Sequence, residues 1–408
     1  MFGFGHREVQ DRFYLTALGR PYRFVPPRPG RIIPALLQRC LPWYMNNKYG
    51  IEQWEVRGAE RLRASIDAGH GVMLAANHSR DSDSVGVGFV GIPAKTHLHF
   101  MAGWHVLLEN WFQYFIIPRA GGFSVLREGN DRKAVRTGVD LVARASRPLF
   151  VFPEGYVSRM NDRLGDLQEG ATLIARQAAR QRDKMVAGKV AAHPVIIKYQ
   201  FLGNLEHTAH AKLARLEIKC KLTSDPALTM TGRLERVREA IVRERELEII
   251  SAPARGPLEE RVPRLIDALL LPLENAWEPP ERSENIYRRV QRLRTAILNH
   301  ATTVRVVGEE KPKLLRQLED CTWALKLSSY QPEYLAESPS AERFMETLDS
   351  LEEDLFGHIR VDRPWRMVLD IGEAIPVEPR DKSLGEKLKR AMETQLGSLA
   401  TELNQPLP

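Results

Sequence analysis

The chain has 408 residues, 43% of them hydrophobic and 27% charged, which is the composition of a folded globular protein. At about 150 residues per domain, this length predicts two to three domains. The cysteines, Cys40, Cys220 and Cys321, are far apart and form no zinc-type spacing with histidine, which argues against a disulfide framework and a structural zinc site. The chain opens without a signal-peptide pattern and has no run of about 18 apolar residues, so we expect a cytoplasmic protein without a transmembrane helix.

Positive charge gathers near the N-terminus. The formal net charge is +7, and residues 12–51 hold seven Lys or Arg residues but no Asp or Glu, so the remaining chain is close to neutral. Because these bases alternate with aromatic and aliphatic residues, residues 1–50 are predicted to form an arm that contacts an anionic membrane surface. The alternative is an arm that packs on its own core. Its prolines predict only a short helix, Pro34–Leu41, and no recognisable nucleic-acid module accompanies it, so we expect no nucleic-acid partner.

Short strands alternate with helices from residue 52 onward. Apolar or alternating runs predict strands over 53–56, 72–76, 97–101, 149–152 and 194–199. Helical spacing predicts helices over 59–68, 130–145 and 169–180, the second of them capped by Asn130. This alternation over residues 51–225 predicts an α/β core with a largely parallel mixed sheet flanked by helices.

The second half of the chain has a different pattern. Residues 226–362 carry long stretches of helical spacing separated by proline and glycine, which predicts a helical insertion. Residues 363–408 return to strand alternation at Arg366–Ile371 and end in an amphipathic helix over Ser383–Leu403. We therefore expect the chain to return to the core after the insertion.

The first candidate site is the segment Asn77–Asp83, which follows a predicted buried strand. Open α/β sheets bind ligands at the carboxyl ends of their strands. His78 can act as a general base, and Asp83 is close enough for a tight turn to bring it onto the imidazole and fix its tautomer. Asp81 is the competing partner. The alternative is a helix N-cap beside a hydrogen-bonded histidine.

Two further segments carry chemically suggestive residues. Phe152–Gly155 delivers a carboxylate and a glycine turn at the end of another predicted strand, although an ordinary strand-to-loop turn has the same pattern. Arg119–Arg127 contains a glycine pair between arginines. Glycine permits close backbone approach and arginine binds phosphate with a bidentate fork. The alternative for this segment is a solvated surface loop.

Together these segments resemble the glycerolipid acyltransferase family, which includes the bacterial 1-acylglycerol-3-phosphate acyltransferases. The family's motifs are Asn-His followed by four residues and Asp, then Gly followed by five residues and Arg, then Phe-Pro-Glu-Gly. The matching residues are Asn77, His78 and Asp83 for the first motif, Gly121 and Arg127 for the second, and Phe152, Pro153, Glu154 and Gly155 for the third. The resemblance covers roughly residues 50–200, with a looser match at Pro194–Ile197.

The resemblance implies a reaction and roles for these residues. It implies transfer of an acyl group from acyl-CoA or acyl-carrier protein to the hydroxyl of a lysophosphatidate-like acceptor, without an acyl-enzyme, a metal or another cofactor. His78 would be the general base and Asp83 its orienting partner. Phe152–Gly155 would shape the acceptor pocket, and Arg127, together with Gly121, would hold the acceptor phosphate. Arg119 and Arg159 are further candidates for that phosphate.

Other functions remain open from the sequence. Within the same class, the acceptor could be glycerol 3-phosphate, another lysolipid or an amino-acid lipid. A hydrolase could use a metal bound by His78, Asp81 and Asp83, and a non-catalytic lipid-binding scaffold could use the helical region. The aromatic stretch Trp104–Pro118 fits either a core helix or a membrane interface. We expect a peripheral protein on the inner face of the membrane, and the oligomeric state is not predicted.

Overall fold

The computed structural model describes residues 22–28, 30–126, 131–184, 188–225, 227–253, 255–277, 285–303, 310–330, 332–336 and 339–407. The chain divides into two compact units. The sheet unit comprises Arg23–Gly203 and Val361–Pro406, and the helical unit comprises mainly Asn204–Arg360. Within the described residues, no helix combines the length and the apolar character needed to cross a membrane.

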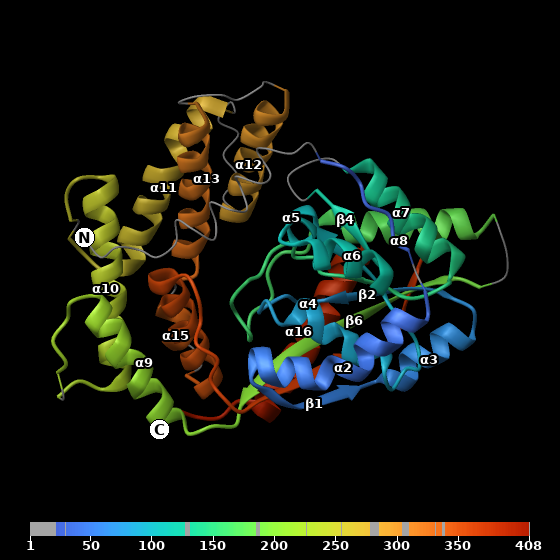
Figure 1. Cartoon of the computed structure of the whole chain (residues 1–408), viewed down its shortest axis with the longest axis horizontal. Coiled ribbons are helices and arrows are strands. Elements are labelled where there is room, and N and C mark those ends of the chain that lie inside the picture. The colour runs from blue at the N-terminus through green and yellow to red at the C-terminus, as the bar shows by residue number, and fades with distance from the viewer. Residues whose placement is uncertain are drawn as a thin grey trace. The chain divides into compact units, whose positions relative to one another are not determined.

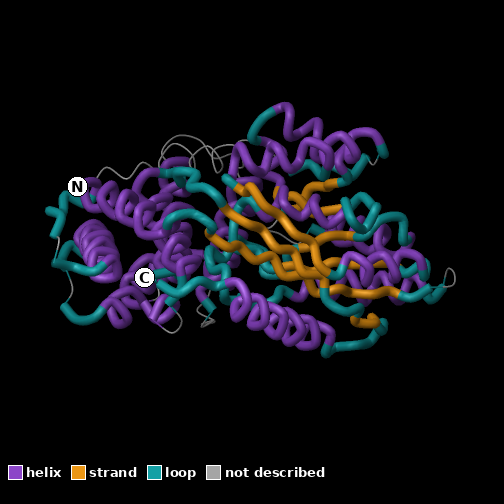
Figure 2. The backbone as a smooth tube through the Cα atoms, turned by 90° about the horizontal axis from the view of Figure 1, so that it is seen from below, coloured by secondary structure: helices purple, strands orange, loops and turns teal. Residues whose placement is uncertain are grey.

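The sheet unit is built on one eight-stranded, mostly parallel sheet, as the sequence predicted. Along the sheet the strands follow the order β1-β7-β6-β2-β5-β3-β4, with β8 paired to β6. All pairs are parallel except those of β6 with β7 and with β8. Figure 2 shows the strands as a twisted sheet with helices around it. The strands are β1 (Ile51–Arg57), β2 (Gly71–Ala76), β3 (His99–Gly103), β4 (Gly122–Val125), β5 (Leu149–Val151), β6 (Val190–Phe201), β7 (Trp365–Ile371) and β8 (Ile375–Val377).

The central strands are apolar because helices cover the sheet. Every residue of β2 is buried, as expected for a parallel strand with both faces covered. Met73 and Ala75 share one core with three helices, α7 (Arg132–Arg144), α8 (Glu169–Arg182) and the first turns of α16 (Leu384–Leu403). The rest of α16 packs on β6 and β7 through Met392, Leu396 and Leu399.

Shorter elements join the strands. They are α2 (Ile32–Tyr49), α3 (Ala59–Asp67), α4 (Asp83–Gly86), the 3₁₀ turn η1 (Val87–Gly91), α5 (Trp104–Leu108) and α6 (Trp111–Ala120). The stretch Trp104–Pro118 thus forms two helices. Trp104 and Leu107 are buried, whereas the aromatic residues of α6 are exposed. The expectation of a core helix therefore holds for Trp104 and Leu107, whereas the exposed aromatic residues that a membrane interface would need are on α6.

The helix in the arm is longer than predicted. The sequence predicted Pro34–Leu41, yet α2 continues through Pro42 to Tyr49. A proline inside a helix removes one backbone hydrogen bond and costs about 3 kcal/mol. Burial of Leu41 and Met45 against the sheet unit offsets this cost. Arg23–Tyr49 therefore belongs to the sheet unit, and residues 1–21 of the predicted arm lie outside the described residues.

The glycine pair marks a strand. A surface loop was one alternative for Arg119–Arg127, but Gly122–Val125 is the sheet's last strand and Gly122, Phe123 and Ser124 are buried. A side chain at Gly122 would collide with the ring of Phe100 on β3, so the glycine permits this pairing. The cap predicted at Asn130 lies outside the described residues; the N-cap is Asp131, which accepts a hydrogen bond from the Ala134 N–H.

The helical unit is built from helices, as Figure 1 shows. It begins at Asn204, earlier than the predicted boundary at 226, because α9 packs against α10 and α15. Helix α9 lies before the helical region that the sequence predicted, whereas α13 lies within it. The helices are α9 (Leu205–Lys219), α10 (Met230–Ile249), α11 (Leu258–Trp277), α12 (Ile286–Thr303), α13 (Glu310–Ser328), α14 (Pro332–Ala336) and α15 (Ala341–Phe356).

Candidate active site

Two of the three sequence segments meet at one edge of the sheet. β2 and β5 are parallel neighbours, with Ala75 opposite Val151. The segments that follow them, Asn77–Asp83 and Phe152–Gly155, therefore both leave the carboxyl edge of the sheet. This edge is where open α/β sheets bind their ligands.

Asp83 folds back onto His78. It is the first residue of α4, and its Oδ2 lies 3.1 Å from the Nδ1 of His78. The same oxygen accepts hydrogen bonds from the backbone N–H groups of Ser79 (2.7 Å) and Arg80 (2.9 Å). Asp81, the competing partner, is exposed. With Nδ1–H donating to a carboxylate, the imidazole presents its Nε2 as the basic nitrogen.

Tyr199 contacts the other oxygen of Asp83. Its hydroxyl donates to Asp83 Oδ1 at 2.5 Å and lies 2.8 Å from Ser82 Oγ. Tyr199 is on β6, next to β2 in the sheet, and is buried. Burial, reinforced by the nearby charge of Asp83, holds the pKa of Tyr199 well above its usual value, so the hydroxyl keeps its proton. The sequence analysis missed this residue, whose signal was a tyrosine ending an apolar strand.

Phe152 and Glu154 hold the histidine from the neighbouring strand end. The rings of Phe152 and His78 stack at a centroid distance of 4.0 Å. Glu154 is fully buried and accepts hydrogen bonds from the backbone N–H groups of His78 and Gly165, both at 2.8 Å. Burial raises the pKa of Glu154 to about 7, against the opposing effect of these two hydrogen bonds. Glu154 thus joins the two segments.

Glycine is required at the turn after Glu154. Gly155 has a φ of 81° and its N–H donates to the Phe152 carbonyl at 3.1 Å. This left-handed conformation is costly for residues with a Cβ. Pro153 precedes the turn and is buried, and its carbonyl accepts from the Gln168 N–H. The turn and this bond tie the segment after Gly155 back to the sheet edge.

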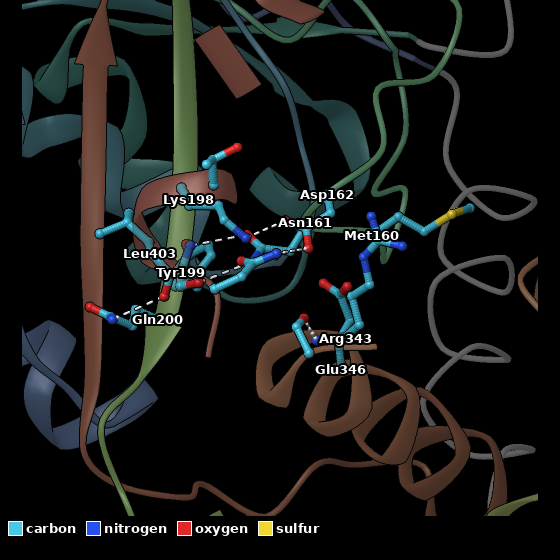
Figure 3. A network of polar contacts seen from close by, with 12 residues as sticks. Met160, Asn161, Asp162, Lys198, Tyr199, Gln200, Arg343, Glu346 and Leu403 are labelled. Carbon is cyan, nitrogen blue, oxygen red and sulfur yellow. Dashed lines mark hydrogen bonds and ion pairs between the residues drawn. The ribbon is translucent and has the colours of Figure 1, made fainter. Parts of the chain in front are cut away.

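Two asparagines fasten the site to β6. The Asn77 amide donates to the Ile197 carbonyl (3.0 Å) and accepts from the Ile197 N–H (2.7 Å). Asn161 makes the same pair of bonds, both 3.0 Å, with the backbone of Tyr199. Figure 3 shows Asn161 beside Tyr199, and next to them the fully buried ion pair of Lys198 with Asp162. Each amide substitutes for a missing strand neighbour, so the strand that carries Tyr199 is fixed in register.

The site also contains a buried hydroxyl that sequence reasoning did not single out. Ser79 is 2% exposed, and its Oγ has no hydrogen-bond partner within the described part of the chain. The His78 side chain is itself only 3% exposed. The ring is therefore covered by the groups around it in this structure.

Of the second motif, the described residues include Gly121 alone. Gly121 ends α6 and precedes β4, so it lies at the amino edge of the sheet, opposite to His78. Its φ of 109°, and the 2.4 Å that would separate a Cβ from the Leu98 carbonyl oxygen, give the glycine a structural reason. Arg127, the predicted phosphate ligand, lies outside the described residues. Arg119 donates to the Phe115 carbonyl on its own helix, and Arg159 is half-buried in the segment after Gly155.

A comparison with known families bears on this geometry. A family model, Acyltransferase, matches residues 53–198. The matched range lies within the sheet unit and includes both segments that meet at the carboxyl edge. No curated protein matches the chain. The family match supports acyl transfer as the general chemistry of the sheet unit.

Proposed function

We propose that the protein is an O-acyltransferase that moves a fatty acyl group from acyl-CoA or acyl-carrier protein to the hydroxyl of a lysophosphatidate-like acceptor. The observation that carries the proposal is the buried contact of His78 with Asp83 inside the range matched by the acyltransferase model. Transfer to an alcohol requires a base at the attacking hydroxyl, and an imidazole held by a carboxylate is suited to that role.

In the proposed reaction the acceptor oxygen attacks the thioester carbonyl carbon while the His78 Nε2 takes the hydroxyl proton. The bond to sulfur then breaks, and the thiolate leaves with that proton as a free thiol. Asp83 stabilises the imidazolium between these steps, and Tyr199 and two backbone N–H groups keep the carboxylate in place. Ser79 Oγ, which is buried beside the histidine, is our candidate for a hydrogen bond to the bound substrate.

The remaining predicted residues enter this proposal in different ways. Glu154 acts through the backbone of His78, since both of its oxygens are already bonded to protein N–H groups. Phe152 supports the ring by stacking. Arg127 stays the predicted ligand of the acceptor phosphate because arginine matches phosphate oxygens with two parallel hydrogen bonds.

We also propose that the sheet unit docks on the inner face of an anionic membrane. The helices α2 and α6 contact one another and expose large apolar side chains. These are Ile32, Leu36, Leu37 and Trp43 on α2, and Trp111, Phe112, Tyr114 and Phe115 on α6. Exposed tryptophan and phenylalanine together with nearby bases are typical of interfacial anchors.

The catalytic proposal is tested by acyl transfer from acyl-CoA and from acyl-carrier protein to a panel of acceptors. We expect His78→Ala to lower kcat by about 10³-fold, the usual scale of general-base catalysis, with the thermal unfolding midpoint retained. Asp83→Asn keeps the shape of the side chain but replaces the carboxylate that contacts the ring. We expect it to lower kcat by a large factor that is smaller than the one for His78→Ala. A His78→Ala protein that acylates at the wild-type rate would overturn the mechanism.

The same assay tests the acceptor. Arg127→Ala is expected to raise KM for phosphorylated acceptors more than for phosphate-free ones. Equal effects on the two kinds of acceptor would contradict a contact between Arg127 and the acceptor phosphate. Membrane docking is tested by flotation of Trp111→Ser, which removes a side chain that is 78% exposed. The matched control is Ile218→Ser on α9, where the side chain is 75% exposed. Equal flotation of the two variants would contradict docking through α6.

A further inference from the structure

A concave site lies at the opposite edge of the sheet from His78. A cavity of about 590 Å³ is lined by the first turns of α2, by residues that precede β3 and by residues that precede β5. β3 and β5 run parallel to β2, so their amino ends lie at the edge opposite to that of His78. We call this cavity the amino-edge pocket; its principal residues are Arg31, Gln38, Arg39, Lys95, His97 and Arg147.

The charge of this pocket is one-sided. Three arginines, a lysine and a histidine line it, and no Asp or Glu is among its lining residues. Burial and the nearby Arg31 lower the pKa of Arg147. Burial, Arg147 and Arg31 lower the pKa of His97 in the same way. The basic groups therefore repel one another, and an anion between them would relieve that repulsion.

The pocket also holds donors without acceptors. Arg147 donates one Nη to the Gly30 carbonyl at 2.9 Å, but its other Nη is buried without a partner in the described part of the chain. The Nδ1 of His97 is likewise buried and unpartnered there. Leaving a buried polar atom without a hydrogen-bond partner destabilises the folded protein. A tetrahedral oxyanion would supply acceptors to both groups.

We infer that the amino-edge pocket binds a phosphate group, separately from the acceptor used at His78. Arginine matches phosphate oxygens with a bidentate fork, and lysine adds a point charge. The phosphate could belong to a lipid head group or to a soluble phosphate.

The apolar surface beside the pocket favours the lipid source. Arg39 lies three residues after Leu36 and four before Trp43, so all three share one face of α2. Leu36 and Trp43 are exposed. A head group in the pocket would place its acyl chains along this face. The lipid source thus rests on the membrane docking proposed above, whereas phosphate binding itself does not.

The test measures binding of the full chain to two probes. The first is flotation with phosphatidylcholine vesicles, with and without phosphatidylglycerol, and the second is calorimetric titration with inorganic phosphate. Arg147→Gln removes the charge of a half-buried arginine of the pocket. The matched control is Arg144→Gln, which replaces an exposed arginine of α7 outside the pocket. Lys95→Gln, at an exposed position, serves as a second pocket variant in case Arg147→Gln does not fold.

We expect Arg147→Gln to lower partitioning onto phosphatidylglycerol vesicles about fivefold, the usual contribution of one basic residue near an anionic surface. Lys95→Gln should act in the same direction, and Arg144→Gln should stay within about twofold of wild type. Phosphate titration that depends on Arg147, with vesicle binding that does not, would assign the pocket to a soluble phosphate. Equal effects of Arg147→Gln and Arg144→Gln on both probes would overturn the inference. Neither readout involves acyl transfer, so the two proposals fail independently.

Discussion

The helical unit and the candidate active site bury charged side chains in different ways, although the sheet unit also holds one fully buried ion pair of the helical unit's kind, Lys198 with Asp162. In the helical unit the Nζ of Lys212, 4% exposed, lies 2.6 Å from Asp349 and 2.7 Å from Glu352. Arg261 pairs in the same way with Glu246. In the sheet unit, Asp83 and Glu154 are fully buried and are bound instead by backbone N–H groups, a tyrosine hydroxyl and an imidazole.

This difference separates a structural scaffold from the site proposed to be reactive. A cation and an anion in direct contact neutralise one another. Removing either of them lowers the stability of the folded protein because the other charge stays buried. A carboxylate that accepts hydrogen bonds from neutral donors is not neutralised by a cation. Its charge, or its proton when it is protonated, can therefore act on a neighbouring group. The kind of partner, rather than the burial of charge itself, therefore distinguishes the candidate site from the ion pairs of the helical unit.

The largest expected effect concerns the buried ion pairs of the helical unit. Lys212→Met removes the cation that Asp349 and Glu352 share and leaves Arg215 as the cation beside Glu352, so we expect the helical unit to lose about 3 kcal/mol of stability. Amide hydrogen exchange in α9 and α15 measures this loss. The control is Lys313→Met, at an exposed position of α13, which should change exchange little. If Lys212→Met matches this control, the buried ions do not support the unit.

Much of the candidate site could be predicted because its decisive contacts are local in sequence. His78 and Asp83 are five residues apart, and a turn at a helix start brings them together. The meeting of Asn77–Asp83 with Phe152–Gly155 follows from parallel strands sharing an edge. The α/β class and most elements of the sheet unit followed from periodicity alone.

The rest could not be predicted because it depends on the order of strands in space. Tyr199 reaches Asp83 from 116 residues away, and only the pairing of β6 with β2 makes that contact possible. The position of β7 between β1 and β6 is likewise a tertiary outcome. The amino-edge pocket joins three separate segments, so no local pattern in Arg31 or Arg147 could reveal it. The sequence did predict Glu154, but not that both of its oxygens bind protein.

The second prediction tests whether Glu154 behaves differently from an ion-paired carboxylate. Its pKa is raised from 4.5 to about 7, so the folded protein holds the proton more tightly than the unfolded chain does. The resulting stabilisation is complete below about pH 4.5 and is lost as the pH rises through 7. It amounts to about 3 kcal/mol, and Glu154→Gln should remove this slope.

The experiment is urea unfolding at pH values between 4.5 and 8, monitored by hydrogen exchange of the β2 amides. Burial lowers the pKa of His99 and His193, which contribute the opposite slope, so the difference between wild type and variant is the informative quantity. Glu373→Gln, the same substitution at a side chain that is 81% exposed, is the control. If the difference in unfolding free energy between wild type and Glu154→Gln does not change with pH, Glu154 behaves like the ion-paired carboxylates of the helical unit.

The smallest effect probes the neutral donor that most clearly distinguishes the site. Tyr199→Phe removes one hydrogen bond to Asp83, and bonds to a charged group contribute about 1.5–3 kcal/mol. We expect kcat to fall at least about tenfold, with KM little changed, because the tyrosine acts on the carboxylate rather than on the substrate. Asn161 holds the backbone of residue 199 through two hydrogen bonds, so the phenylalanine ring should keep its position.

A purely structural role for Tyr199 makes a different prediction. It would lower the unfolding midpoint and the amount of active protein but leave kcat per folded molecule and the pH–rate profile unchanged. A positioning role should instead lower kcat per folded molecule while KM and the unfolding midpoint stay close to those of wild type, because an Asp83 carboxylate with one donor fewer is held less firmly against the ring. An unchanged kcat per folded molecule in Tyr199→Phe would mean that the site, like the helical unit, uses its buried partners for stability alone.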